Sequence, residues 1–128
     1  MTRLARLRSP DAGQATVELA MMLPFLALLM LALVQAVVLA RDQLLVTHAA
    51  REAARATAVD PDPGAARRAA VGAAPLDPDR LQVDTGPRGA IGTSVRVEVR
   101  YLEPTTLPLV GAIGDVTLRS EATMRVER

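Results

Sequence analysis

The sequence has no cysteine, lysine or tryptophan, a single histidine and only two aromatic residues. The absence of cysteine excludes a disulfide scaffold, a thiol nucleophile and a cysteine-based zinc or iron–sulfur site. With His48 as its one histidine, the chain is poorly equipped for a metal site or a Ser-His-Asp triad, so we expect no metal and no cofactor. The 15 basic residues are balanced by 14 acidic ones, which predicts no broad basic surface for nucleic acid. Together these shortages argue against an enzyme and against a nucleic acid-binding protein.

A long uncharged segment lies between Glu18 and Arg41. Residues 19–40 are mostly Leu, Ala, Val and Met. As a helix they would extend about 33 Å, close to the ~30 Å hydrocarbon core of a bilayer. The alternative, a buried core helix, needs more protein around it than a chain of 128 residues supplies. We therefore predict that residues 19–40 span a membrane and contact its lipid.

The charges on either side of this segment predict its orientation. Residues 1–12 contain three arginines and a single acid, Asp11, whereas the arginines after residue 40 are matched by acids. The positive-inside rule then leaves the N-terminus in the cytoplasm and places the chain after Ala40 outside. A secretory signal peptide has the same order of basic and apolar residues, but its apolar region is usually about 7–15 residues long. Cleavage after Ala40 by signal peptidase is therefore the less favoured alternative.

Helical character continues beyond the apolar segment. Residues 41–59 contain no glycine or proline and are rich in alanine, the best helix former. Small and apolar residues recur on one helical face, and polar residues occupy the opposite side. The first set is Leu45, Ala49, Ala53 and Ala56, and the second is Gln43, Arg51, Glu52 and Arg55. Prolines 61 and 63 then stop the helix, so we predict one helix over residues 14–60.

Residues 61–128 are predicted to form a small extracytoplasmic α+β domain. A short alanine-rich helix is expected over 64–74, interrupted by a glycine. Alternating apolar and polar residues predict strands at 95–101 and 116–126, and a shorter strand is expected at 81–84. The predicted fold class is therefore α+β, with the long N-terminal helix packed on a small antiparallel sheet of about three strands.

The most informative motif directly precedes the apolar segment. Gly13 and Gln14 follow the basic leader, and Glu18 stands five residues after Gly13. This arrangement resembles the processing site of type IV prepilins, in which the apolar helix follows the cleavage point and is retained. With Pro24 and the sequence AAREAAR at 49–55, the chain resembles the TadE/TadG pilin-like proteins of Tad (tight adherence) pilus systems. The alternating valine strand and the last strand extend this resemblance to most of the chain.

The resemblance implies a pilin-like fold and a structural role as a minor pilin or pilin-like subunit of a Tad-type pilus. Residues 1–13 would be a leader that a prepilin peptidase removes after Gly13, leaving Gln14 where pilins commonly have Phe or Met. The protein would be single-pass in the bacterial cytoplasmic membrane, or extracellular in the pilus after processing. Implied partners are the peptidase, other pilins and Tad assembly-platform membrane proteins, in a homo- or hetero-oligomer formed through the N-terminal helix. The alternatives are a permanently anchored assembly factor that never enters a filament, and an anchored binding or enzymatic domain, which would need a polar pocket.

Glu18 has two open explanations. A carboxylate inside the hydrocarbon costs about 2.5–3.5 kcal/mol and therefore needs a partner. Cleavage after Gly13 would create an α-amino group on Gln14, one helical turn away, or on a neighbouring subunit shifted along the filament. Only a processed chain could then form this pair and assemble. In the other explanation, Glu18 lies near the lipid headgroups and gains about 0.3–1 kcal/mol from the helix dipole.

Two features of the apolar segment suggest helix packing. Ala32, Ala36 and Ala40 are spaced four apart, a small-xxx-small stripe that allows helices to approach closely in lipid. Alanine-rich spans also contain such stripes by chance. Pro24 removes one backbone hydrogen bond, so it is either a kink or one of the prolines that membrane helices tolerate.

Beyond the membrane, the polar residues suggest surfaces rather than catalysis. Arg51, Glu52 and Arg55 form either a solvated or ion-paired face or a contact with a partner. His48 is expected on the helix surface, since no second metal ligand is visible. The apolar loop at 107–110 either packs under the sheet or meets a neighbouring pilin.

Overall fold

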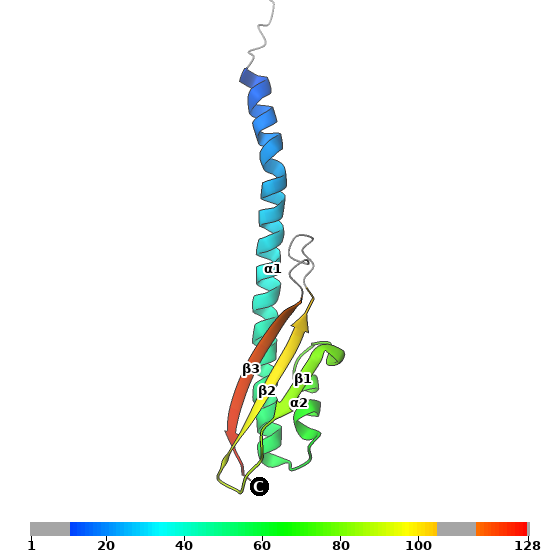
Figure 1. Ribbon diagram of the computed structural model, residues 1–128, viewed down its shortest axis with the longest axis vertical. Helices are drawn as coiled ribbons and strands as arrows, with labels where there is room; N and C mark the ends of the chain where they lie inside the picture. The colour runs from blue at the N-terminus through cyan, green and yellow to red at the C-terminus, as the bar shows by residue number, and fades with distance from the viewer. Residues whose placement is uncertain (1–10, 105–114, 128) are drawn as a thin grey trace, which may run out of the picture. The chain divides into compact units, whose positions relative to one another are not determined.

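The computed structural model describes residues 11–104 and 115–127 of the chain. Two groups of predictions lie outside the described residues, those on the leader at 1–10 and those on the loop at 107–110. The described residues form a long helix, a short helix, a 3-10 turn and three strands (Figure 1). This arrangement confirms the α+β class.

Helix α1 (Asp11–Val59) begins three residues earlier than predicted and ends one residue earlier. It continues as a helix through Pro24. Its end follows from the local sequence. The N–H of Asp60 donates to the carbonyl of Ala56 at 2.8 Å, and Pro61 has no N–H with which to extend the ladder.

The chain divides into two compact units, Met1–Val34 and Gln35–Arg128. The described part of the first unit is the N-terminal portion of α1, whose large apolar side chains are exposed on every side. A helix that is apolar all round needs protein or lipid around it. Helix α1 is also long and apolar enough to cross a bilayer, so the first unit has the surface expected of a membrane span.

In the second unit, a three-stranded antiparallel sheet packs on the C-terminal part of α1. The elements that follow α1 are α2 (Ala65–Ala73), the 3-10 turn η1 (Pro78–Arg80), β1 (Leu81–Thr85), β2 (Ser94–Glu103) and β3 (Val116–Arg125). The three predicted strands are confirmed to within two residues at each end, whereas η1 is not predicted. Helix α2 runs through Gly72 instead of being interrupted there, and it lies beside β1 (Figure 1).

The strand register places the valines of β2 on one face of the sheet. Val97 stands opposite Ala122 of β3, and Val99 stands opposite Val83 of β1. Because side chains alternate between faces, a slip of one residue would turn this whole apolar set toward solvent. The burial of one face therefore fixes the pairing.

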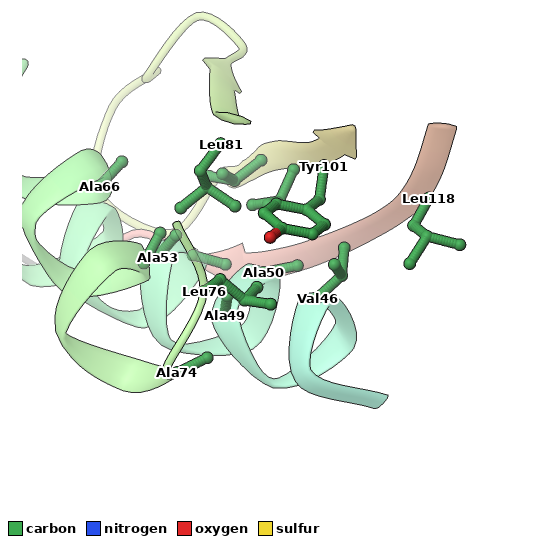
Figure 2. Packing of buried hydrophobic residues seen from close by; sticks show 14 residues of the cluster. Val46, Ala49, Ala50, Ala53, Ala66, Ala74, Leu76, Leu81, Tyr101 and Leu118 are labelled. Atoms are coloured by element: carbon green, nitrogen blue, oxygen red, sulfur yellow. The ribbon is translucent and has the colours of Figure 1, made fainter. Parts of the chain in front are cut away.

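The core forms where this face meets the alanines of α1 and α2 (Figure 2). Its buried members are Val46, Ala49, Ala50, Ala53, Ala54, Ala66, Ala70, Ala74, Leu76, Leu81, Val97, Val99, Tyr101 and Leu118. Four alanines of α1 in this set have no exposed surface, so the helix backbone lies close to the sheet. The predicted helical face is confirmed at Ala49 and Ala53, while Leu45 and Ala56 are only partly buried.

One residue of the predicted polar side of α1 was placed wrongly. Gln43 is half-buried, and its side-chain amide donates to the carbonyl of Arg119 in β3 at 2.9 Å. It therefore faces the edge of the sheet and not the solvent. The reason is long-range, because the carbonyl that accepts this bond belongs to β3, 76 residues further along the chain.

Residues from other segments donate hydrogen bonds to the last carbonyls of α1. Its last turn has no basic residue, and Arg88 from the loop between β1 and β2 takes this place. Arg88 donates from Nε to the carbonyl of Thr57 at 3.0 Å and from Nη2 to that of Ala58 at 3.3 Å. The N–H of Glu127 also donates to Ala58, at 3.1 Å. These bonds satisfy carbonyls that have no partner within the helix.

Candidate functional site

The N-terminal motif lies in the first turns of α1. Gly13, Gln14 and Glu18 are all exposed. The side-chain amide of Gln14 donates to Oε1 of Glu18 across 3.4 Å, from one helical turn to the next. The carboxylate is thus within reach of groups on residue 14, while cleavage of the peptide bond before Gln14 stays a prediction.

Gly13 has no evident role in the fold of the described residues. A Cβ atom added there would meet nothing within 4 Å, and the only glycine with a positive φ among the described residues is Gly92. Glycine inside a helix is less favourable than alanine by about 0.5–1 kcal/mol. Neither crowding nor backbone geometry therefore accounts for glycine at this position.

The predicted packing residues of the apolar segment are exposed in the single chain. Ala32, Ala36 and Ala40 are all accessible, as are the large side chains among them, such as Leu33 at 54 %. None of these three exposed alanines is buried against another described element. Contacts through this stripe, and a kink at Pro24, stay predictions.

The second predicted surface lies on the side of α1 that faces away from the sheet. Arg51 and Arg55 are exposed, Glu52 is half-exposed, and His48 is on the surface as predicted. Among the residues that the structure describes, none of these four side chains makes an ion pair. The face is therefore solvated and not ion-paired in the single chain, and its two arginines outnumber its one acid, Glu52.

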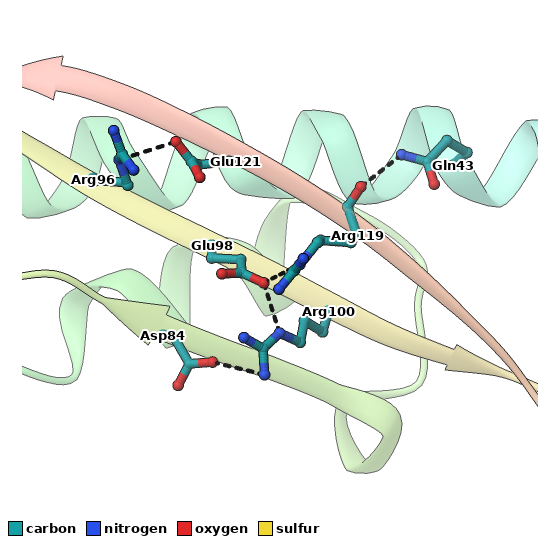
Figure 3. Close-up of polar contacts among 7 residues, drawn as sticks. All are labelled: Gln43, Asp84, Arg96, Glu98, Arg100, Arg119 and Glu121. Atoms are coloured by element: carbon teal, nitrogen blue, oxygen red, sulfur yellow. Dashed lines mark hydrogen bonds and ion pairs between the residues drawn. The ribbon is translucent and has the colours of Figure 1, made fainter.

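The outer face of the sheet, by contrast, is charged and internally paired (Figure 3). This charged outer face consists of Asp84, Arg96, Glu98, Arg100, Arg119 and Glu121. Glu98 binds Arg100 at 2.6 Å and also binds Arg119, and these bonds hold its pKa below the ordinary value, the bond to Arg100 most strongly. Three arginines and three acids cancel, so this face is neutral and hydrated.

A pair of carboxyl groups joins α1 to the end of β2. Asp42 is buried, with 6 % of its surface exposed, and it pairs with Nη1 of Arg41 at 3.2 Å. Burial raises the pKa of Glu103, and the charge of Asp42 and the hydrogen bond between the two side chains raise it further, while Arg80 opposes them. The carboxyl group of Glu103 therefore lies close to that of Asp42, where α1 meets the end of β2.

At the same end of the sheet lies a hollow of about 260 Å³. We call it the acidic hollow, and it is lined by Asp79, Arg80, Leu102, Pro104 and Asp115. Arg80 is engaged by Asp77 at 3.3 Å, whereas the side chains of Asp79 and Asp115 make no ion pair among the described residues. Within residues 11–104 and 115–127, no group of three or more acidic or histidine side chains could hold a metal ion.

Sequence reasoning missed Arg88, the Asp42–Glu103 pair and the acidic hollow. A signal for Arg88 existed, because α1 ends without a basic residue of its own and a cation elsewhere was needed to complement its carbonyls. No comparable signal pointed to the other two. They depend on which residues of η1 and β2 the folded chain brings beside one another.

Comparison with known families supports the N-terminal motif. Residues 13–55 match a family model described as TadE-like protein. The matched segment contains Gly13, Glu18, the apolar run and the helical face up to Arg55, and it ends before the sheet. Comparison with curated proteins and with solved structures gave no match. The match over residues 13–55 and the apolar helix, which is long enough to cross a membrane, indicate a protein associated with Tad pili; about a third of the chain resembles TadE-like proteins.

Proposed function

We propose that this protein is a structural minor pilin or pilin-like subunit of a Tad-type pilus. A prepilin peptidase cuts it after Gly13, and the mature chain keeps α1 as its membrane helix and assembly element. The observation that carries the proposal is a glycine that the fold does not require, standing before a surface-exposed glutamate inside the segment that matches the TadE-like family.

Recognition by a peptidase accounts for Gly13 where folding does not. A protease must bring backbone into close contact with its own active site, and glycine at the cut offers no side chain to obstruct it. The bond lies in the first turn of α1, where backbone N–H groups lack helical partners and the helix opens most easily. The first turn therefore favours access to the bond between Gly13 and Gln14.

Cleavage changes the electrostatics around Glu18. Before the cut, the neutral amide of Gln14 is its neighbour at 3.4 Å. The cut creates a positively charged α-amino group on the same residue, or on that of an adjacent subunit. An ion pair offsets part of the penalty of about 2.5–3.5 kcal/mol for a charge in the hydrocarbon, and the pair is available only to processed chains.

The span and its flanking charges complete the proposal. Residues 19–40 cross the cytoplasmic membrane, the basic leader remains inside, and the unit formed by Gln35–Arg128 lies outside. Partners are the peptidase, other pilins and the membrane proteins of the assembly platform. The role is structural: the chain contributes a helix for packing and a folded unit for display.

The decisive test is the mass and the N-terminal sequence of the mature protein from its own host. We expect a chain that begins at Gln14, and a Gly13→Leu variant that keeps its leader. Gly72→Leu is the matched control, because Gly72 is also helical and also has nothing within 4 Å of an added Cβ. A mature natural chain that still carries residues 1–13 would overturn the proposal.

A second experiment separates a filament subunit from a permanently anchored assembly factor. Cells are sheared, and the filament fraction is probed for this protein. We expect the natural chain in that fraction and a Glu18→Ala variant retained in the membrane, with Glu127→Ala as the control for an exposed acid outside α1. Retention of the natural chain in the membrane would favour the anchored factor.

A further inference from the structure

The exposed side of α1 in the second unit carries a cationic stripe, which we define as His48, Arg51 and Arg55. These residues recur every three or four positions and so share one helical face. The same face continues to Leu44, whose side chain is 72 % exposed. Arginine beside exposed aliphatic surface is a composition enriched at protein interfaces.

The stripe differs from most other described arginines of the unit because its charges are not used internally. Arg67 and Arg88 donate to backbone carbonyls, and Arg68 meets Asp62 at 2.5 Å. Arg41, Arg80, Arg96, Arg100 and Arg119 also pair with acids, whereas Arg125 at the end of β3 makes no ion pair among the described residues. No such partner accompanies Arg51 or Arg55 within the described part of the chain. The stripe is therefore available to a partner of opposite charge.

The same chain displays a complementary surface in the acidic hollow. Asp79 and Asp115 line it without an ion-pair partner among the described residues, beside Leu102, which is 37 % exposed. The hollow thus offers two carboxylates and a patch of aliphatic surface, which match two arginines and one exposed leucine. Both surfaces belong to the second unit, and they use different elements: α1 for one, and η1 with the ends of β2 and β3 for the other.

We propose that the cationic stripe of one copy docks into the acidic hollow of a second copy of this chain. A contact between two different surfaces of identical chains is heterologous, and it continues from copy to copy unless a ring closes. Repetition of this contact would give each copy a defined neighbour on either side. It extends the proposed function by naming the extramembrane contact between subunits, and it does not itself require cleavage at Gly13.

Anionic lipid is the less suitable occupant of the stripe. Arg51 and Arg55 lie 11 and 15 residues beyond Ala40, which corresponds to about 16 and 22 Å of helix. Electrostatic attraction to a lipid surface decays within a Debye length of about 8–10 Å. Arg41 is nearer to the end of the span, but it is already paired with Asp42. A protein surface that extends outward along α1 fits the distances better.

The absence of cysteine makes a site-specific test direct. Two differently tagged full-length copies are co-expressed, one with Arg55→Cys and the other with Asp115→Cys, and membranes are treated with a short bis-maleimide. We expect mixed dimers at about tenfold or more above a control pair of Arg55→Cys with Thr123→Cys, which is exposed toward the other end of β3. Equal yields for the two pairs, no mixed dimer, or dimers formed only between two copies of the Arg55→Cys chain would overturn the proposal.

Charge reversal supplies an independent measurement. Arg51→Glu with Arg55→Glu places four acids at the contact, and like charges facing each other are strongly unfavourable, so we expect oligomers in mild detergent to fall about tenfold. Adding Asp79→Arg and Asp115→Arg to the same chain restores the complementarity and should restore the oligomers. Arg125→Glu, outside both surfaces, is the control. Oligomers that are unchanged by the first pair, or not restored by the second, would contradict the contact.

The state of the leader is read by intact mass in the same samples, which keeps this inference distinct from the proposed function. Cross-linking between residues 55 and 115 in chains that retain residues 1–13 would support the contact and count against processing. Processed chains in the filament fraction without this cross-link would support the pilin role and overturn the contact. Oligomers that are unchanged by charge reversal, together with less anionic lipid retained by the detergent-purified chain, would instead identify lipid as the occupant.

Discussion

The two portions of α1 use apolar side chains in opposite ways. In the first unit the large side chains are exposed, from 40 % for Leu31 to 73 % for Phe25. In the second unit the side chains facing the sheet are small, and Ala49 and Ala53 have no exposed surface. Both portions are helical and both have apolar faces, but the first exposes large side chains to its surroundings and the second buries small ones against the sheet.

This difference follows from what surrounds each portion. Lipid tails adapt to any side chain, so a membrane helix can carry large residues on all sides without fitting a particular neighbour. A sheet is a fixed surface, and close packing against it leaves little room for a larger side chain. Side-chain size, more than hydropathy, therefore distinguishes the part of α1 built for lipid from the part built for protein. Matched substitutions in the two portions should have unequal effects.

Replacing a buried leucine should have the largest effect on stability. Leu81 is 2 % exposed at the start of β1, and Leu81→Ala is expected to destabilise the second unit by about 2–5 kcal/mol through lost burial and a cavity. Because Tyr101 is the only tyrosine and there is no tryptophan, its fluorescence in detergent reports on this unit alone. Leu29→Ala, at a position 55 % exposed in the first unit, should leave the unfolding midpoint unchanged. Equal shifts in the two variants would refute the contrast.

Enlarging alanine tests the same contrast in the other direction. Ala53→Leu forces three additional carbon atoms between α1 and the sheet, which should destabilise the second unit by about 1–3 kcal/mol. Ala32→Leu meets no protein neighbour and should not move the Tyr101 transition. If Ala32 packs against another helix in the membrane, however, this variant should lower oligomer yield without any change in stability. A stable Ala53→Leu chain would show that the helix and the sheet are less closely packed than the structure indicates.

The end of α1 distinguishes the second unit further, since its carbonyls are satisfied by a residue from a distant loop. Arg88→Ala removes two hydrogen bonds from a charged donor and a favourable interaction with the helix dipole. We expect a loss of about 1–2 kcal/mol, measured by the urea midpoint of Tyr101 fluorescence. Arg125→Ala is the control for an exposed arginine in the same unit. No difference between the two variants would mean that water replaces the Arg88 cap at little cost.

The parts of the fold that the sequence predicts are those that a single segment determines. The span at 19–40 follows from uninterrupted apolar length, and the strands follow from alternation over a few residues. The position of Gln43 could not be predicted in this way. Helical periodicity assigned it to the polar side, but the carbonyl of Arg119 in β3 provides a hydrogen bond there. Such a contact depends on how the sheet lies on the helix.

The residues of the candidate site also fall into two groups, those that a single segment predicts and those that only the folded chain brings together. Gly13 and Glu18 are near one another in sequence, so their spacing suggested both a motif and a family, and residues 13–55 match a model of that family. Arg51 and Arg55 were identified as a partner face from their periodicity. The acidic hollow could not be found because Asp79 and Asp115 are 36 positions apart and precede different strands. Their proximity is a product of folding.

The smallest expected effect is a change in how the stability of the second unit depends on pH. It tests the part of α1 near Asp42, which is the second charged residue after the apolar segment. A raised pKa of Glu103 means that its stabilising contribution is present below the ordinary value of a glutamate and is lost as the pH rises through the folded value. Glu103→Gln should therefore flatten the decline of the urea midpoint toward higher pH. Glu98 has the opposite sign, because its lowered pKa gives a contribution that is present above the ordinary value and lost as the pH falls. Glu98→Gln should accordingly flatten only the acid side, and a chain in which both variants altered the same side would contradict the opposite pKa shifts of Glu103 and Glu98.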